Sequence, residues 1–183
     1  MIFTGGADED LLVNTGTVTG TLNFGGDSGN DLLHNTASLA SVIFTGGADA
    51  DLLVNTGTVS GGLNFGGDSG NDLLTNSGSI SSVIFTGGAD SDLLLNSGTI
   101  TTSLNFGGDS GNDLLLNDGP VATVIFTGGA DSDRMLNTRS GVSSITFYGG
   151  AAAGSSLPAG TSDGEDLLLN TGSGIASIVF SGD

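Results

Sequence analysis

The sequence predicts an all-β protein, a single parallel β-helix (β-solenoid) that spans residues 1–183. The first observation is a repeat, which reads F-T-G-G-A-D-A-D-L-L at residues 44–53 and F-G-G-D-S-G-N-D-L-L at residues 65–74. Its successive phenylalanines are 21, 20, 21, 20, 21, 20 and 21 residues apart, and the last gap is 33. The second observation is that apolar residues come in short groups between Gly, Asn, Asp and Ser, without a helical period. Such a period is typical of a solenoid, in which each repeat packs only on its neighbours.

Each repeat predicts one rung of the solenoid, with three short strands. In the first strand the second residue after each loop is nearly constant, so we expect it inside: Leu12, Leu33, Leu53, Leu74, Leu94, Leu115, Met135 and Leu168. Because side chains alternate along a strand, the Asn two residues further on also points inward, and stacked Asn side chains can form an amide ladder. The second and third strands bring two further apolar columns inside, and the third is followed by the repeating Phe.

The repeat also predicts the outline of the rod. We expect about eight rungs of 20–21 residues, paired as 41-residue units, and a right-handed coil, because parallel crossovers are almost always right-handed. Residues 151–162 interrupt the last rung, and their small residues with Pro158 favour a surface loop. A contact arm or an end cap is the alternative interpretation of this insertion.

Composition restricts the function. The 183 residues include 34 Gly and 20 Asp or Glu, but only two Arg, no Lys and no Cys, and the formal net charge is −18. A chain without basic surface is a poor partner for nucleic acid, and anionic membranes repel it. No apolar run is long enough to insert in a membrane. The first residues already belong to the repeat, so we expect no N-terminal signal peptide.

The loops gather most of the acidic residues. With an Asp at one fixed position in every rung and a second Asp that alternates in placement, we expect sixteen carboxylates along one edge of the rod. Carboxylates about 4.8 Å apart repel each other, and Ca²⁺ suits a flexible cage of oxygen ligands. The alternative is that each Asp caps its own turn by accepting backbone N–H groups. The candidate calcium ligands are Asp8, Asp10, Asp27, Asp31, Asp49, Asp51, Asp68, Asp72, Asp90, Asp92, Asp109, Asp113, Asp131, Asp133, Asp163 and Asp166.

The stretch G-G-A-D-A-D-L-L (residues 46–53) resembles the repeats-in-toxin (RTX) nonapeptide, whose stacked turns bind Ca²⁺. It departs from that pattern because Asp49 stands where the family has its third Gly, and because only one side of each rung carries the motif. A one-sided pattern with rungs near 20 residues also looks like the β-helices of autotransporter passengers and bacterial adhesins. The resemblance implies calcium binding and an extracellular or cell-surface location.

The outer positions of the first strand form an apolar stripe, which a soluble monomer should not expose. Its members are Leu11, Val13, Leu32, Leu52, Val54, Leu73, Leu93, Leu95, Leu114, Leu116, Leu136, Leu167 and Leu169. We expect another copy or another chain to cover it; an inverted in/out assignment is the alternative. On the third strand, Ile and Asn alternate from rung to rung, which fits either a lateral contact or duplication of the 41-residue unit.

These observations favour a structural extracellular protein, stabilised by calcium, that associates with itself head-to-tail or laterally into a filament, sheath or matrix. Open rung ends would allow head-to-tail stacking, and a piece of a longer β-helix is the other interpretation of those ends. A β-helical segment of a secreted adhesin is the alternative function. An ice-binding surface is disfavoured because the Thr array is broken, and an enzyme because the carboxylates are equivalent from rung to rung.

Overall fold

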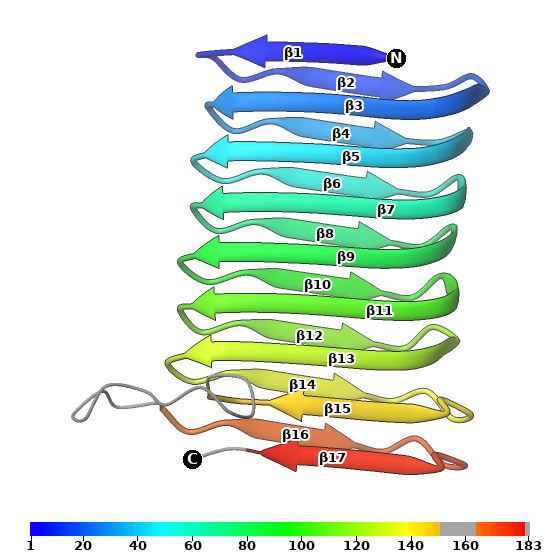
Figure 1. The fold of residues 1–183 in the computed structure, drawn as a ribbon, viewed down its shortest axis with the longest axis vertical. Helices are drawn as coiled ribbons and strands as arrows, with labels where there is room; N and C mark the ends of the chain where they lie inside the picture. The colour runs from blue at the N-terminus through cyan, green and yellow to red at the C-terminus, as the bar shows by residue number, and fades with distance from the viewer. Residues whose placement is uncertain (151–163, 182–183) are drawn as a thin grey trace.

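A computed structural model of the chain, which describes residues 1–150 and 164–181, shows a parallel β-solenoid (Figure 1). The strands of the described residues form two sheets, one of nine long strands and one of eight short strands, and every pairing is between parallel strands. The chain alternates between the two sheets, so each long strand pairs with the long strand of the next rung. The predicted fold class is therefore confirmed.

The long strands of the first sheet are β1 (Ile2–Gly6), β3 (Val18–Ser28), β5 (Ser38–Ala48), β7 (Thr58–Ser69), β9 (Ser79–Ala89), β11 (Thr99–Ser110), β13 (Val121–Ala130), β15 (Ser144–Tyr148) and β17 (Ser177–Ser181). The short strands of the second sheet are β2 (Leu11–Asn14), β4 (Leu32–Asn35), β6 (Leu52–Asn55), β8 (Leu73–Asn76), β10 (Leu93–Asn96), β12 (Leu114–Asn117), β14 (Arg134–Asn137) and β16 (Leu167–Asn170). The rungs are continuous from β1 to β15, and the insertion that we predicted is residues 151–162. The predicted insertion thus lies outside the described residues.

The prediction of three strands per rung is wrong. The second and third predicted strands are one long strand, which bends at a register shift, for example between Val18 and Thr21 of β3 where it pairs with β5. There Val18 pairs with Leu39 but Thr21 pairs with Ser41, so β3 contains one residue more than β5 between the two pairs. This bulge accounts for the extra residue in the 21-residue rungs that contain β3, β7 and β11, because a bulge absorbs one residue without breaking the pairing on either side.

The core is a set of straight columns, one residue per rung. The rings of Phe24 to Phe147 are stacked nearly parallel, with centroids 4.8–4.9 Å apart for each neighbouring pair. The inner Leu of each short strand is buried from β4 to β12, as is Met135 of β14. Between them, Asn side chains donate from rung to rung, as in the bond of 2.7 Å from Asn35 Nδ2 to Asn55 Oδ1. The predicted inside positions and the Asn ladder are confirmed.

The coil follows the predicted hand. In Figure 1 the long strands lie nearer the viewer and run from right to left as the chain descends, which makes the solenoid right-handed. The described residues contain no helix that could cross a membrane.

Candidate functional site

Each of the six loops that join a long strand to a short strand from β3 to β14 contains two residues with positive φ, two positions apart. In one rung type these are Gly47 (φ 109°) and Asp49 (φ 77°), and in the other they are Asp68 (φ 79°) and Gly70 (φ 102°). The two loop types therefore share one backbone path with Gly and Asp exchanged. Asp tolerates the left-handed region better than most residues. This exchange explains why Asp49 replaces the third Gly of the nonapeptide pattern.

Side chains of one loop cap the backbone of the next. Asp49 Oδ2 accepts a hydrogen bond of 3.2 Å from the N–H of Gly29 in the preceding rung, and Asn30 Oδ1 accepts one of 3.0 Å from the N–H of Ala50. The same two bonds recur along the rod at equivalent residues. The alternative interpretation is that each Asp caps its own turn. The structure shows capping of this kind, but the side chain and the backbone N–H that it accepts from belong to neighbouring rungs.

The Asp at the fixed loop position is buried, not on the edge where we expected it. Asp51 and Asp72, like their counterparts from Asp31 to Asp133, are at most 2% exposed. Oδ1 of each accepts a hydrogen bond from the backbone N–H of the equivalent Asp in the preceding rung, at 2.8 Å between Asp51 N and Asp72 Oδ1. The bonds continue from Asp10 to Asp166 at 2.7–2.9 Å. We call this column the Asp ladder.

A glycine makes room for each member of the Asp ladder. Oδ2 of Asp72 lies only 1.8 Å from where a Cβ on Gly67 would be, and the equivalent Gly faces the equivalent Asp in the other rungs. The Oδ2 atoms of Asp31, Asp51, Asp72, Asp92 and Asp113 are buried and have no hydrogen-bond partner among the described residues. The glycine two residues after each Phe, such as Gly46 and Gly67, is therefore required by packing against a carboxyl group, which the sequence did not reveal.

Burial changes the ionisation of the Asp ladder. Desolvation raises the pKa of Asp72 and Asp113 to about 8, that of Asp92 to about 7 and that of Asp51 to about 6. The hydrogen bond from the preceding rung acts in the opposite direction, and neighbouring carboxylates raise the pKa further. Desolvation by burial also raises the pKa of Asp31. At neutral pH, part of the ladder is therefore protonated, which reduces the repulsion that suggested bound cations.

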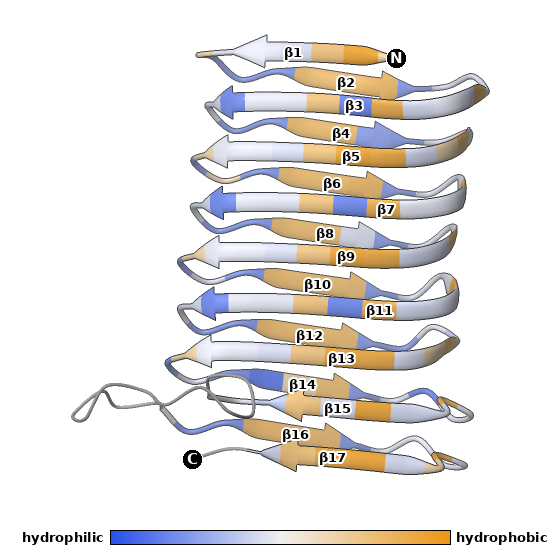
Figure 2. Cartoon of the chain, viewed as in Figure 1, coloured by the Kyte–Doolittle hydropathy of each residue, from blue (hydrophilic) through white to orange (hydrophobic). Residues whose placement is uncertain are grey.

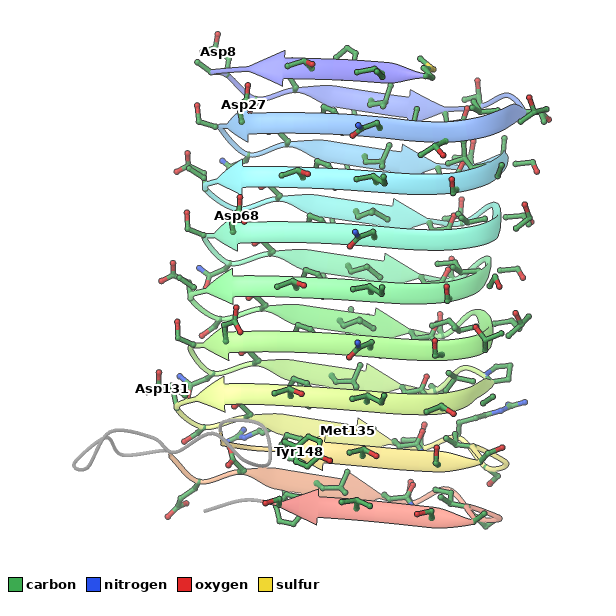
Figure 3. All side chains as sticks on the ribbon, viewed as in Figure 1. Asp8, Asp27, Asp68, Asp131, Met135 and Tyr148 are labelled. Carbon is green, nitrogen blue, oxygen red and sulfur yellow. The ribbon has the colours of Figure 1, made fainter. Side chains whose placement is uncertain are left out.

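The sixteen candidate calcium ligands thus fall into different surroundings. Asp10 to Asp166 form the inward ladder, whereas the alternating series, from Asp8 and Asp27 to Asp131, stands exposed along one edge (Figure 3). Asp163 lies outside the described residues. In the described part of the chain, no three acidic or histidine side chains come together in a group that could hold a metal ion. These positions form no ready-made cage, and calcium binding stays a prediction.

The outer face of the short strands carries the apolar stripe, and we call it the leucine face. All its members point outward, as the alternating burial of β4 to β12 shows, so the predicted in/out assignment is confirmed. The short strands are apolar over most of their length (Figure 2). An open groove of about 620 Å³ runs over this face, with Leu95, Leu116 and Leu136 in its wall, Thr75 at one side and Asp118 at its end.

Sequence reasoning missed two groups of loop residues, the capping Asn and the glycine beside each Asp. The signal for the Asp ladder was present, because Asp51, Leu53 and Asn55 are two residues apart and alternation places them on one face. The signal for the capping Asn was the G-N-D sequence of one rung type. Comparison with models of known protein families, with curated proteins and with solved structures finds no significant match to this chain.

Proposed function

We propose that this chain is a structural protein, a rigid solenoid rod that associates with further copies of itself through the leucine face. The observation that carries the proposal is the continuity of that face: outward Leu or Val side chains follow one another from β2 to β16. At the ends, Leu11 is 61% exposed and Leu167 is 51% exposed. Contiguous apolar surface of this kind marks an interaction site in soluble proteins.

Charge favours another copy as the occupant of the leucine face. The chain has a formal net charge of −18, yet the outer positions of the short strands carry no acidic side chain. Arg134 and His34 lie on this face, whereas the exposed Asp residues lie along the loop edge. Two copies can therefore meet here with less repulsion than at the acidic edge.

The size of the leucine face suits a reversible contact. Four residues in each of eight short strands cover about 13 Å by about 38 Å, or roughly 500 Å² per copy. Two such faces bury roughly 1,000 Å², which is at the lower end for specific interfaces. Lateral association through this face alone is therefore weak, and many copies in an array would reinforce one another.

The composition of the chain also bears on its location in the cell. We place the rod outside the cell or on its surface, because a chain without Lys and with only two Arg gives trypsin-like proteases few sites. We also propose that rods stack head-to-tail, as the resemblance to RTX and adhesin repeats suggests. If rods associate laterally or head-to-tail, electron microscopy of the purified protein would show sheets or filaments; if they do not associate, it would show only single rods.

The leucine face is tested with the double variant Leu95→Thr/Leu116→Thr. Thr already occupies the same slot at position 75, so the fold should tolerate the change. We expect sedimentation velocity to show concentration-dependent association of the unchanged protein, and at least about a tenfold higher midpoint concentration for the variant.

The control introduces Thr at two exposed alanines at the ends of β5 and β9, Ala48→Thr/Ala89→Thr. It should associate like the unchanged protein, and thermal unfolding should show that both variants are folded. An unchanged protein that stays monomeric at all concentrations, or a Leu variant that associates as before, would refute the proposal.

A further inference from the structure

The outer face of the long strands, on the opposite side of the rod, carries a two-rung pattern that the leucine face does not explain. In register along this sheet, Ile43 pairs with Asn23 and Asn64, and Thr45 pairs with Gly25 and Gly66. The alternation continues through β9, β11 and β13. Figure 2 shows it as polar segments in β3, β7 and β11 where β5, β9 and β13 are apolar. We call this surface the comb face.

The comb face has ridges and notches of constant spacing. Ile and Thr form a ridge on every second rung, and the exposed fractions of Ile43 and Ile84 are 39% and 49%. Asn and Gly form the notch between two ridges. With rungs about 4.8 Å apart, successive ridges are roughly 9.6 Å apart.

The glycines in the notches are not required by the rod itself. A Cβ added to Gly25, Gly66 or Gly107 would meet no atom within 4 Å, and none of the three has a positive φ. They differ from the loop glycines, whose Cβ would collide with backbone or with an Asp carboxyl group. Glycine inside a strand weakens it and often marks a place where another chain approaches closely. The open notches therefore have their explanation outside this chain.

We propose that the comb face binds the comb face of a second copy, with the Ile–Thr ridges of each copy seated on the Asn–Gly notches of the other. Ridges and notches on the comb face both repeat every two rungs. When two comb faces meet and one copy is shifted by one rung along the rod, the ridges of each copy therefore lie opposite the notches of the other. A two-fold axis along the strand direction, midway between two rungs, produces this displacement at every rung. Each Thr then faces a Gly of the partner, and each Ile faces an Asn, in a closed two-fold contact.

Charge and area favour the second copy as the occupant. The three outer columns of this face consist of small polar residues such as Ser41, Ile alternating with Asn, and Thr alternating with Gly. They carry no charged side chain between β3 and β13, whereas the next outer position of β3, β7 and β11, at the loop edge, holds an exposed Asp (Asp27, Asp68 and Asp109). Over the seven strands from β1 to β13, the columns cover about 18 Å across and about 34 Å along the rod, or roughly 600 Å² per copy. Two copies would bury roughly 1,200 Å², which reaches the size of a specific interface.

This inference rests on the proposed function because both describe self-association of the rod. The contacts use two different surfaces, the leucine face and the comb face. A rod with a contact on each of two opposite faces forms an extended layer instead of a closed pair. Lateral growth therefore requires both the leucine face and the comb face.

The test fills the notches with the residue that stands at the same register in the neighbouring rungs, Gly25→Thr/Gly66→Thr/Gly107→Thr. Because these positions have open space, we expect the triple variant to unfold at the same temperature as the unchanged protein or higher. We expect its assemblies to fall to the size that the leucine face alone supports. The control Gly16→Thr makes the same change at another open glycine, in the turn between β2 and β3, and should leave assembly unchanged.

Sedimentation velocity of four proteins separates the two surfaces: unchanged, notch-filled, Leu95→Thr/Leu116→Thr, and the combination. The inference predicts small assemblies for each single-face variant and monomers for the combination. If notch filling leaves assembly unchanged while the Leu variant reduces it, the comb contact is refuted and the leucine face stands. If only notch filling reduces assembly, the comb contact stands and the leucine face is refuted. A monomeric unchanged protein would refute both.

Discussion

In the rungs that read F-G-G, the two neighbouring glycines have different physical roles. Gly66 faces open space, whereas Gly67 lies against the carboxyl group of Asp72, with the carbonyl oxygen of Gly87 also close. The fold of the rod therefore does not require glycine at position 66. Glycine is required at position 67, because the inward carboxyl group of the following loop occupies the space that a side chain would need.

This difference predicts opposite effects of the same mutation. Gly67→Ala places a methyl group where the Asp72 carboxyl lies, and we expect it to lower the free energy of unfolding by about 2–4 kcal/mol. Gly66→Ala should leave the stability unchanged or raise it by up to about 1 kcal/mol, because Ala restricts the unfolded chain and suits a strand better. Urea unfolding of the two variants measures both values. Equal effects would show that the Asp carboxyl does not occupy the space beside Gly67.

Comparison of the rungs predicted the inside of the rod well and the loops less well. Columns such as Phe44 and Leu53 could be predicted because apolar residues repeat at one position and strands alternate. Asp51 was expected outside because a carboxylate is rarely buried without a partner. Its backbone N–H partners come from the neighbouring rung, and residue type alone does not show a contact between rungs. The merged long strand was missed because a bulge, not a turn, forms the bend.

At the scale of whole elements, two polar ladders connect the rungs of the short-strand sheet at its two ends. The Asn ladder is neutral, and each amide both donates and accepts, as between Asn55 Nδ2 and Asn76 Oδ1 at 2.8 Å. From Asp31 to Asp113 the Asp ladder accepts with Oδ1, and the Oδ2 atom of each of these five groups is buried without a hydrogen-bond partner among the described residues, which is costly whenever the group is charged. The two ladders therefore respond differently to pH.

The Asp ladder predicts a solenoid that is more stable in mild acid than at alkaline pH. The folded-state pKa values of Asp51, Asp72, Asp92 and Asp113 lie at about 6 to 8, above the ordinary value of 3.8. Between these values the folded state binds more protons than the unfolded state, so stability is fully present below about pH 4 and is lost as pH rises through 6 to 8. We expect the melting temperature to be higher at pH 5 than at pH 8.5.

A neutral amide at one rung separates this effect from the rest of the acidic surface. Asp72→Asn keeps the acceptor for the N–H of Asp51 and removes the buried charge, so we expect it to flatten the fall in stability between pH 5 and 8.5. The control Asp8→Asn removes an exposed charge from the loop edge at the first rung, away from Asp72, and should leave the slope nearly unchanged. Equal slopes for the Asp72 variant and the unchanged protein would contradict a raised pKa at Asp72.

At the scale of the whole molecule, the rod separates its charge from its contact surfaces. Exposed carboxylates such as Asp49 and Asp68 lie along the loop edge, whereas the leucine face and the comb face occupy the two sheets. Protonation of the buried ladder relieves part of the repulsion between rungs, but the exposed series has no such relief. The remaining acidic edge can attract cations from solution and thereby affect the stability of every rung at once.

Calcium binding is therefore tested on the intact rod by comparing ions at equal ionic strength. We expect millimolar Ca²⁺ to raise the melting temperature and a chelator to reverse the change, because a ligand that binds only the folded state stabilises it by about 2.7 kcal/mol at 100 times its Kd. For a chain of this size that energy corresponds to a shift of roughly 5–10 °C. Sodium chloride at the same ionic strength screens the exposed carboxylates without coordinating them, so it should produce a much smaller shift. A calcium shift no larger than the sodium shift would mean that the loops carry charge but hold no calcium, and that the cross-rung caps alone maintain the loop edge.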